Sequence, residues 1–340
     1  MRDLTTLPKT HLHLHFTGSM RPQTLAELAE EAGIRLPPAL LDGVALRVPA
    51  SERGWFRFQR LYDAARAVVR SEHAMRRIVR EAAEDDAAEG SRRLEIQVDP
   101  TSYAPHVGGL TPALEIVLDE ARAASRDVGI EIGVVVAASR TRHPLDARTL
   151  ARLAVRHMDD GVIGFGLSND ERRGDTSEFA AAFSIARRAG LASLPHGGEL
   201  LGPDHIRDVL AHLGPTRLGH GVRLAEDLPL LEKVNEAGIA LELAPASNVA
   251  LGVYPTPADV PLRTLFEAGA QIALSADDPL LFVSRLNDQY RIAREDHGMD
   301  DAELAELARG SVRASLASAD SKRRWLAEID AWLATPPPSA

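Results

Sequence analysis

The sequence predicts an α/β protein folded as a (β/α)₈ TIM-type barrel, with extra helices after the first strand and at the C-terminus. Three observations support this fold class. Short segments of strand character alternate with amphipathic helical segments along the chain. Eight such strand segments are found, near residues 12, 96, 133, 165, 192, 218, 241 and 273. The 340 residues, 45% of them hydrophobic, suffice for one large barrel core.

A doubly wound open sheet is the alternative arrangement of the same elements. It would need a glycine-rich phosphate loop after a strand, and none is found; nor does a linker divide the chain. The barrel is therefore favoured. We expect a single domain over residues 1–334 and a proline-rich flexible tail over residues 335–340.

Each element follows from its local pattern, taken in chain order. Strands are expected at the alternating stretch around residue 12 and at residues 94–98, 130–136, 162–167, 191–194, 217–219, 239–243 and 271–274. Helices are expected at residues 21–33, 51–70, 72–89, 110–128, 145–158, 178–189, 204–213, 228–237 and 262–268, with further helices through residue 333. Residues 36–49 and 99–106 are expected to form loops, since both are rich in proline.

The predicted helix at residues 51–70 is aromatic. It contains Trp55, Phe56, Phe58 and Tyr62 within two turns. This pattern is typical of a stripe that faces the core, and it is equally compatible with a lid over a planar ligand. The sequence leaves both interpretations open.

Composition excludes several classes of function. Lys and Arg number 39 against 49 Asp and Glu, a net charge of −10 without any basic block, so nucleic-acid and anionic-membrane partners are not expected. Cysteine is absent, which excludes disulfides and thiolate nucleophiles and leaves histidine and carboxylate as metal ligands. The chain shows no hydrophobic signal core and no run of 18 apolar residues, so we expect a cytoplasmic protein.

Histidines alternate with apolar residues over residues 11–16. Because side chains alternate across a strand, we expect the three histidines to share one face. Imidazoles two residues apart lie about 7 Å apart along a strand, close enough for His13 and His15 to bind one metal ion. His11 lies deeper in the strand and is expected to point into the barrel interior. Packing alone does not readily explain three alternating histidines.

Polar residues gather at the C-terminal ends of the predicted strands. They are His13 and His15, Asn169, His196 and Glu199, His220, and Asp277 with Asp278. In a barrel those ends form a single mouth, where active sites lie. The seven remaining histidines fall elsewhere and are interpreted as structural or surface residues; they are His73, His106, His143, His157, His205, His212 and His297.

The strand-end residues sort by their chemistry. His13, His15, His196 and Asp277 form a set of three nitrogen ligands and one oxygen ligand that suits Zn²⁺, and also Fe²⁺, Mn²⁺ or Co²⁺. A water molecule bound at such a site has its pKa lowered to about 7 and becomes a nucleophile at neutral pH. One divalent metal ion, Zn²⁺ in the first place, is therefore the expected cofactor.

Proton transfer needs a second group beside the metal. Glu199 is a candidate proton carrier, His220 a candidate to hold or deprotonate the water, and Asp278 a candidate hydrogen-bond partner of the substrate. Each residue taken alone has a structural interpretation. His220 fits a loop histidine, Glu199 a carboxylate at a helix entry, and the Asp277–Asp278 pair a helix N-cap. Their common position at the strand ends favours the functional interpretation.

Five motifs resemble the adenosine deaminase family of the metal-dependent amidohydrolase superfamily, whose members are (β/α)₈ barrels. The motifs are Pro8-Lys9-Thr10-His11-Leu12-His13-Leu14-His15 with Gly18-Ser19, His196-Gly197-Gly198-Glu199, Gly219-His220-Gly221, Pro245-Ala246-Ser247-Asn248 and Ser275-Ala276-Asp277-Asp278-Pro279. They follow the order and spacing of the family over nearly the whole chain. Any one of them alone would be weak; together they are specific.

The resemblance implies a hydrolytic deaminase with one Zn²⁺ on the four predicted ligands. Activated water would add to C6 of a 6-aminopurine while Glu199 protonates ring N1. His220 would orient the nucleophile and accept its proton, and Asp278 would contact N7. Collapse of the tetrahedral intermediate would expel ammonia and leave an inosine-type product.

The chain departs from the family pattern on the substrate side. Thr17 stands where the family has an aspartate that reaches the ribose hydroxyls, and Asn169 replaces a glycine whose backbone faces purine N3. Gly197 replaces an alanine in the family's His-Ala-Gly-Glu motif. His15, Thr17, Asn169 and Asp278 are the expected substrate-binding residues. The departures leave the metal ligands and proton carriers intact.

The expected substrate is a small purine nucleoside, adenosine or 2′-deoxyadenosine. Adenine, aminodeoxyfutalosine and N6-substituted adenine nucleotides, the substrates of related branches, are the alternatives. Two other classes of function remain open: a different hydrolysis, of an amide or ester, at the same metal, and an inactive relative that binds or signals. Glu199 with the Asp277–Asp278 pair favours purine deamination over both. The sequence does not determine the oligomeric state.

Overall fold

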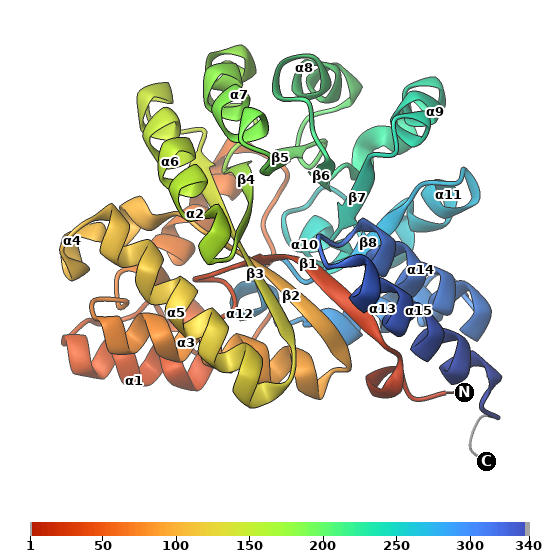
Figure 1. Ribbon diagram of the computed structural model, residues 1–340, viewed down its shortest axis with the longest axis horizontal. Coiled ribbons are helices and arrows are strands. Elements are labelled where there is room, and N and C mark those ends of the chain that lie inside the picture. Colours follow the sequence, from red (N-terminus) through yellow and green to blue (C-terminus); the bar gives the residue numbers. More distant parts are fainter. Residues whose placement is uncertain (1, 337–340) are drawn as a thin grey trace.

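The computed structural model describes residues 2–336, and its centre is one sheet of eight parallel strands in the order β1 to β8 (Figure 1). The strands are β1 (Lys9–His15), β2 (Ser91–Val98), β3 (Glu131–Ser139), β4 (Val162–Ser168), β5 (Ala192–Gly197), β6 (Arg217–His220), β7 (Ala240–Leu243) and β8 (Ile272–Leu274). A parallel bridge between Leu14 and Asp277 joins the first strand to the residues that follow the last. The predicted (β/α)₈ barrel is confirmed.

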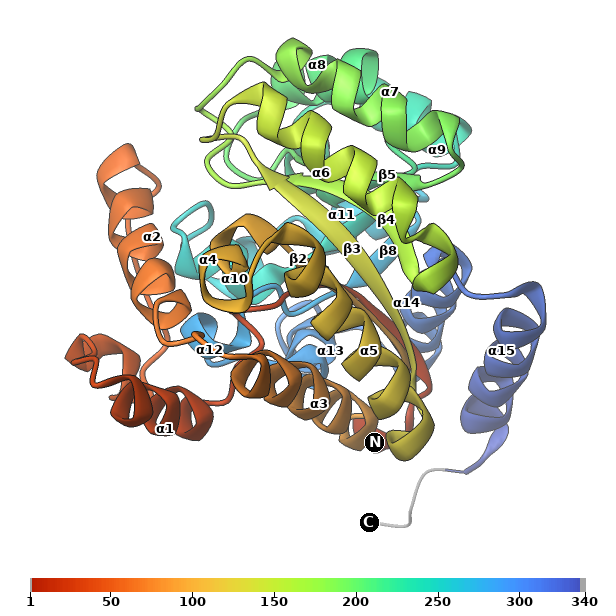
Figure 2. The same ribbon diagram turned by 60° about the vertical axis from the view of Figure 1, so that its left-hand side comes forward.

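Helices surround the barrel and occupy the connections between strands. They are α1 (Pro22–Ala32), α2 (Glu52–Arg66), α3 (Glu72–Ala88), α4 (Ala104–Val107), α5 (Leu110–Val128), α6 (Pro144–Arg156), α7 (Ala180–Arg188), α8 (Pro203–Leu213), α9 (Leu228–Glu236), α10 (Pro245–Ala250), α11 (Leu262–Glu267), α12 (Pro279–Phe282), α13 (Leu286–Glu295), α14 (Asp301–Ala314) and α15 (Ala319–Ala334). Figure 2 shows α2, α10 and α12 on one side of the barrel and α15 on the other. The predicted extra helices after the first strand and at the C-terminus are both present.

Local sequence explains where several helices begin. The side chains of Ser51, Ser71 and Ser318 each accept a backbone N–H in the first turn of α2, α3 and α15. Two short helices, α4 and α10, were not predicted. The expected loop at residues 99–106 contains α4 and a 3₁₀ turn, Pro100–Ser102. Helices of one or two turns carry too few residues for a helical period to stand out from the sequence.

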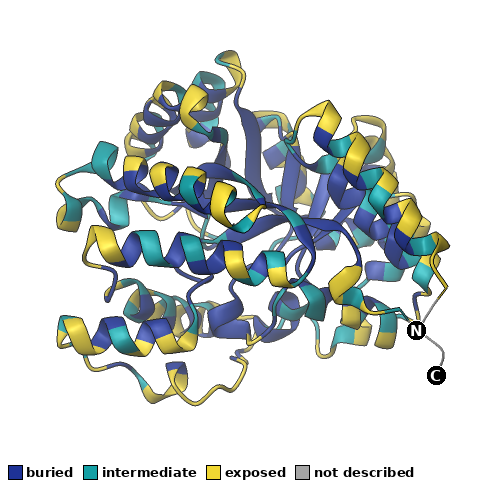
Figure 3. Cartoon of the chain, turned by 60° about the horizontal axis from the view of Figure 1, so that its bottom comes forward, coloured by how far each residue is buried: buried dark blue, intermediate teal, exposed yellow. Residues whose placement is uncertain are grey.

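Burial follows the layers of the barrel. Figure 3 shows buried strands, and helices whose exposed residues lie on their outward faces. The apolar core packs between the strands and these helices. Among residues 2–336, no helix combines the length and apolarity needed to cross a membrane.

The barrel interior contains a chain of buried charges instead of aliphatic side chains alone. Arg217 donates to Glu242 at 2.5 Å and to Glu95 at 2.6 Å, and Arg93 donates to the second oxygen of Glu95 at 2.7 Å. All four residues are 5% exposed or less. Two positive and two negative groups balance one another, which is the condition under which buried charges are tolerated.

His11 does not share a face with His13, and the prediction that it points into the barrel interior is wrong. Its Nδ1 lies 2.9 Å from Asp86 of the outer helix α3, and its Nε2 accepts a hydrogen bond from the Ala276 backbone at 3.0 Å. The reason is a register shift between β1 and β2, where three steps from His11 to Leu14 match two steps on β2. An extra residue of this kind breaks the strict alternation of a strand.

The N-terminal segment lies close to the end of α15 (Figure 1). Arg2 donates to the carbonyl oxygens of Leu333 and Thr335 at 2.6 and 2.9 Å. Of the predicted tail, residues 337–340 lie outside the described residues. The single domain over residues 1–334 stays a prediction.

Candidate functional site

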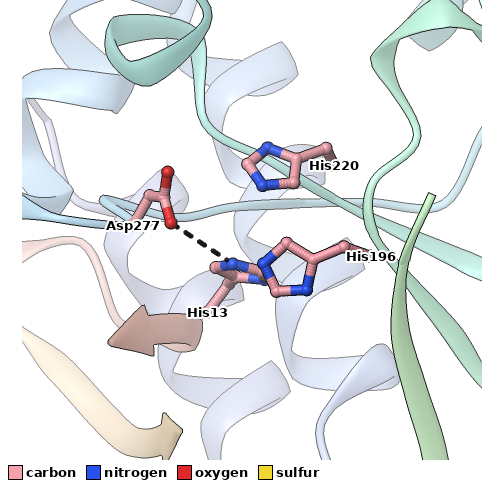
Figure 4. Close-up of side chains that lie close together, drawn as sticks. All are labelled: His13, His196, His220 and Asp277. Carbon is pink, nitrogen blue, oxygen red and sulfur yellow. Dashed lines mark ion pairs between the residues drawn. The ribbon is translucent and has the colours of Figure 1, made fainter. Parts of the chain in front are cut away.

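The four predicted metal ligands meet at the C-terminal mouth of the barrel. Asp277 Oδ1 lies 3.4 Å from His13 Nε2 and 3.2 Å from His15 Nε2, and His15 Nε2 lies 3.3 Å from His196 Nε2. Ligand atoms of a tetrahedral ion with bonds of 2.0–2.1 Å are about 3.3 Å apart. The three distances match that spacing. Figure 4 shows the side chains of His13, His196 and Asp277 turned toward one another.

The polar atoms at this point fit a cation. Within residues 2–336, His13 Nε2 is buried and has no hydrogen-bond partner. Two imidazole nitrogens that face each other at 3.3 Å, as in His15 and His196, present lone pairs to the same point unless one of them is protonated. A shared divalent cation would satisfy all of these atoms.

His220 belongs to the same cluster. Ligand atoms of His13, His196, His220 and Asp277 all lie within 4.8 Å of one another, and so do those of His15, Asp277 and Asp278. The sequence had assigned His220 to proton transfer and His15 to the metal. The geometry brings both histidines to the cluster, with His220 Nε2 also 3.7 Å from Glu199 Oε1.

Supporting hydrogen bonds orient two of the candidate ligands. Glu242 of β7 accepts from His13 Nδ1 at 2.7 Å, which leaves Nε2 free to face the cluster. Ser247 of α10 donates to Asp277 Oδ2 at 2.7 Å, which leaves Oδ1 directed at the histidines. Burial raises the pKa of Glu242, but Arg217 and the His13 hydrogen bond outweigh it and lower that pKa to about 2.

Glu199 and Asp278 are buried carboxyl groups with raised pKa values. Glu199 is 2% and Asp278 3% exposed. Burial, and then the negative charge of Asp277, hold the pKa of both groups well above the usual range. Burial also lowers the pKa of the His220 imidazole, to about 4. Buried carboxyl groups with raised pKa values, beside an imidazole whose pKa is lowered, are suited to proton transfer.

Three residues at the mouth have a left-handed backbone that side chains other than glycine seldom adopt. They are Asn169, with φ of 82°, and His220 and Asp277, both with φ of 64°. They lie at the ends of β4, β6 and β8. Such strain costs of order 1–3 kcal/mol per residue and concentrates at functional sites. The chain therefore directs these three side chains at some cost in stability.

A cavity of about 270 Å³ opens above the cluster. Its metal end contains His15, His196, His220, Glu199, Asp277 and Asp278, and the predicted residue Asn169 is also in its wall. The aromatic helix α2 contributes Trp55, Phe58 and Tyr62 to the wall of the cavity. Phe58 also packs on Phe282 with ring centroids 5.8 Å apart. Helix α2 is thus both part of the core and a wall of the cavity.

Thr17 is buried and is not among the residues that line the cavity. Its hydroxyl lies 2.5 Å from the hydroxyl of Tyr103, and Tyr103 does line the cavity. Tyr103 therefore stands between Thr17 and the space for a ligand. The neighbouring Gly18 is required by close packing, since a Cβ there would lie 1.8 Å from Asp278 Oδ1.

Sequence reasoning missed a second group of cavity residues. They are Arg66, Gln97, Asp99, Ser102, Tyr103, Ser139, Thr141 and Arg142. Several follow β2 or β3 directly, so their position after a strand was an available signal for Asp99, Ser102 and Thr141. Arg66 lies at the end of α2, far in sequence from any strand, and nothing in its surroundings marked it.

Comparisons with known proteins agree with this arrangement. A family model described as adenosine deaminase matches residues 8–332. A Streptomyces virginiae protein named "Putative adenosine/adenine deaminase" is 62% identical over 333 residues, covering 98% of this chain and 98% of the relative. The adenine deaminase of Agrobacterium fabrum is 32% identical over 324 residues, covering 95% of this chain and 98% of its own.

Two solved structures share the fold closely. The crystal structure of adenine deaminase from Arthrobacter aurescens has a TM-score of 0.89 and 27% identity, over 97% of this chain and 100% of that one. The N6-mAMP deaminase of Arabidopsis has a TM-score of 0.85 and 26% identity, over 96% of this chain and 99% of that one. The similarity extends along the whole barrel in both cases.

Proposed function

Since this chain belongs to the adenosine deaminase family and is a hydrolytic deaminase, we propose that its substrate is a 6-aminopurine nucleoside, adenosine or 2′-deoxyadenosine. The products are inosine or 2′-deoxyinosine and ammonia. The observation that carries the proposal is a buried carboxyl group with a raised pKa, Glu199, which lies beside the histidine cluster in the wall of a cavity of purine size.

Polar residues in the wall of the cavity favour a nucleoside over the free base. In addition to the candidate metal ligands, the hydroxyl residues Ser102, Ser139 and Thr141 line the cavity. Sugar hydroxyls need such partners, whereas adenine alone would leave this wall to water. Adenine is the second candidate, because Thr17 supplies no carboxylate to a ribose and relatives of this chain are named adenine deaminases.

One divalent metal ion, Zn²⁺ in this proposal, would be held by His13, His15, His196 and Asp277. When bound, such an ion lowers the pKa of a coordinated water to about 7 and so supplies a nucleophile at neutral pH. The spacing of the four ligand atoms and the unpartnered His13 Nε2 support this set.

The side chains around the metal set would handle the protons. Glu199, protonated because burial raises its pKa, donates to purine N1 and makes C6 electrophilic. His220, neutral because burial lowers its pKa to about 4, accepts the proton of the attacking water. Asp278, whose pKa is also raised by burial, donates to N7. The C6–N6 bond then breaks, ammonia leaves with the proton held by His220, and the proton of the C6 hydroxyl passes back to Glu199 as the C6 carbonyl forms.

The remaining residues would exclude water and orient the purine. Trp55, Phe58 and Tyr62 of α2 cover the cavity with aromatic surface, against which a planar ring can pack. Asn169 and His15 complete the wall beside the purine. The net charge of −10 and the absence of a basic block favour a small-molecule substrate over nucleic acid or an anionic membrane surface.

The test is an ammonia-release assay on protein of measured zinc content. Adenosine, 2′-deoxyadenosine, adenine, aminodeoxyfutalosine and N6-methyl-AMP are compared by kcat/KM. A preference for adenosine or 2′-deoxyadenosine of at least tenfold supports the proposal. A preference for adenine, or for a substrate altered at the 5′ position or at N6, keeps the chemistry and overturns the substrate. Elemental analysis of the purified protein identifies the metal.

A further inference from the structure

One short segment, residues 196–201, carries two different functional groups. It leaves the end of β5 and reaches α8 through a turn at Gly198, whose φ is 79°. His196 is a candidate metal ligand and Glu199, three residues later, is the proposed proton carrier. The segment has no regular secondary structure after Gly197 to fix it. Its position must come from bonds to other parts of the chain.

Glu171, in the turn after β4, holds the Glu199 side of the segment. Its Oε1 accepts the backbone N–H of Glu199 at 3.1 Å. Its Oε2 accepts those of Leu200 and Leu201 at 2.8 and 2.7 Å. The carboxylate is 2% exposed, so three consecutive amides converge on one buried charge. Charge-assisted hydrogen bonds of this kind are among the stronger ones in proteins.

Arg140, directly after β3, holds the His196 side. One terminal nitrogen of its guanidinium, Nη2, donates to the His196 carbonyl oxygen at 2.9 Å, and the other, Nη1, donates to Thr176 Oγ1 at 3.1 Å. Arg140 is 2% exposed. Its backbone N–H bonds to the Ser168 carbonyl at 3.0 Å, which anchors the base of the side chain to the end of β4.

Neither charge is needed to stabilise an ordinary loop. A buried carboxylate and a buried guanidinium both carry a large desolvation cost, and water or a neutral amide could satisfy the same backbone groups. What the two charged groups add is rigidity at two points three residues apart. The bonds of Glu171 end at the Glu199 amide, and the bond of Arg140 ends at the His196 carbonyl.

We propose that Glu171 and Arg140 are positioning residues with separate tasks: Glu171 fixes the proton carrier Glu199, and Arg140 fixes the metal ligand His196. The inference rests on the roles proposed above for those two residues. It predicts that the two tasks can be separated by mutation. Loss of the Glu171 bonds lowers kcat without loss of metal, and loss of the Arg140 bond lowers metal affinity first.

The first variant is Glu171→Gln, which has nearly the same shape but a single acceptor oxygen. We expect kcat to fall about 10- to 100-fold, the cost of displacing a catalytic group by a fraction of an ångström to 1 Å. KM and zinc content should stay within twofold of wild type. Affinity for a purine riboside with a hydroxyl on a tetrahedral C6 should fall by the same factor as kcat, while affinity for inosine stays unchanged.

Two companions of Glu171→Gln keep the result interpretable. Glu171→Asp retains both acceptor oxygens and should recover part of kcat. This variant also replaces Glu171→Gln in the test if Glu171→Gln does not fold. Glu178→Gln, an exposed position nearby that makes no side-chain hydrogen bond within residues 2–336, is the matched control and should match wild type. A parallel loss of kcat and zinc in Glu171→Gln, or unchanged kcat, overturns the proposal.

The second variant is Arg140→Met, with the exposed Arg188→Met as its control. We expect zinc affinity, measured by competition with a chelator, to fall about tenfold or more relative to the control. At saturating zinc, kcat should return to within a few-fold of wild type. Unchanged zinc affinity overturns the task assigned to Arg140. Arg140→Lys, which keeps one donor, should recover part of the affinity and replaces Arg140→Met if that variant does not fold.

The outcomes separate this inference from the proposed function. If Glu199→Gln remains fully active, the proton-carrier role fails, whatever the Glu171 variants do. If Glu199→Gln is inactive and Glu171→Gln equals its control, the proton-carrier role survives and the positioning role of Glu171 fails.

Discussion

His13 Nδ1 donates a hydrogen bond to Glu242 Oε2 across 2.7 Å, and both side chains are buried. The bond joins β1 to β7 beneath the mouth of the barrel. It fixes the imidazole with Nε2 facing the other candidate ligands. Because Arg217 holds the second oxygen of Glu242 at 2.5 Å, the carboxylate remains ionised, and a negatively charged partner increases the basicity of His13 as a ligand.

Replacing Glu242 with glutamine should weaken metal binding. Glu242→Gln keeps an oxygen that can accept from His13 but removes the negative charge. We expect a 10- to 100-fold lower zinc affinity, measured with a competing chelator, and an activity that recovers in part as zinc is added. The exposed Glu232→Gln on α9 is the control. Equal zinc affinities in the two variants would show that Glu242 does not tune His13.

Replacing Glu199 with glutamine should abolish turnover and keep the metal. The amide of Glu199→Gln could still hydrogen-bond to the purine but could not protonate N1. We expect kcat to fall at least 10²- to 10⁴-fold, the usual worth of a general acid, with zinc content unchanged. Single-turnover ammonia release and elemental analysis give the two readouts. Full activity of Glu199→Gln would contradict the mechanism.

The Thr17–Tyr103 hydroxyl pair should behave as a unit in stability. Thr17→Val leaves the buried Tyr103 hydroxyl without this partner, and we expect a loss of about 1–3 kcal/mol in the free energy of unfolding. The double variant with Tyr103→Phe should recover most of that loss, because both polar groups are then gone. Urea unfolding of the wild type, of Thr17→Val, of Tyr103→Phe and of the double variant measures the four free energies of unfolding. Additive losses in the double variant would argue against direct coupling.

Acid should weaken the buried charge network through Glu95. Burial raises the pKa of Glu95, but Arg217 and Arg93 outweigh it and lower the pKa below its ordinary 4.5. A carboxyl whose pKa is lowered by folding stabilises the protein above its unfolded pKa, and this contribution is lost as the pH falls through the folded pKa. Stability from this source is therefore present at pH 7 and declines below about pH 4.5.

The variant Glu95→Gln provides the comparison. At pH 7 it should be less stable than wild type by about 3–5 kcal/mol, since it leaves buried arginines with a neutral partner. The difference in the free energy of unfolding between the wild type and Glu95→Gln should become smaller as the pH falls below about 4.5. Urea unfolding at a series of pH values measures it, with the exposed Glu115→Gln as control. A difference that stays constant with pH would exclude Glu95 as the titrating group.

Periodicity predicted the barrel because each strand is a short apolar segment between amphipathic helices, and all eight were placed. The same periodicity failed for His11, where one extra residue in β1 reverses the facing of the side chain. No residue type marks such a bulge here. It depends on how β1 pairs with β2, which is a property of the fold.

The candidate ligands could be predicted because metal chemistry limits the residue types and strand ends fix their location. The partners behind them could not. The three bonds of Glu171 to residues 199–201 depend on how two loops fold against each other. Tyr103 reaches the cavity from the residue after a 3₁₀ turn, and Arg66 reaches it from the end of α2. Sequence patterns do not encode how far these elements lie from the cavity.

The closure of the barrel between β1 and β8 determines the stage of synthesis at which the histidine cluster can form. At this seam the His15 N–H donates to the Asp277 carbonyl at 3.0 Å, and the Asp277 N–H donates to the His13 carbonyl at 3.1 Å. A nascent chain therefore exposes its first histidines almost at once, but it cannot complete the cluster until the last strand has left the ribosome. A bound ion would tie β1 to the residues that follow β8, so that the full ligand set is available only after all eight strands have been made.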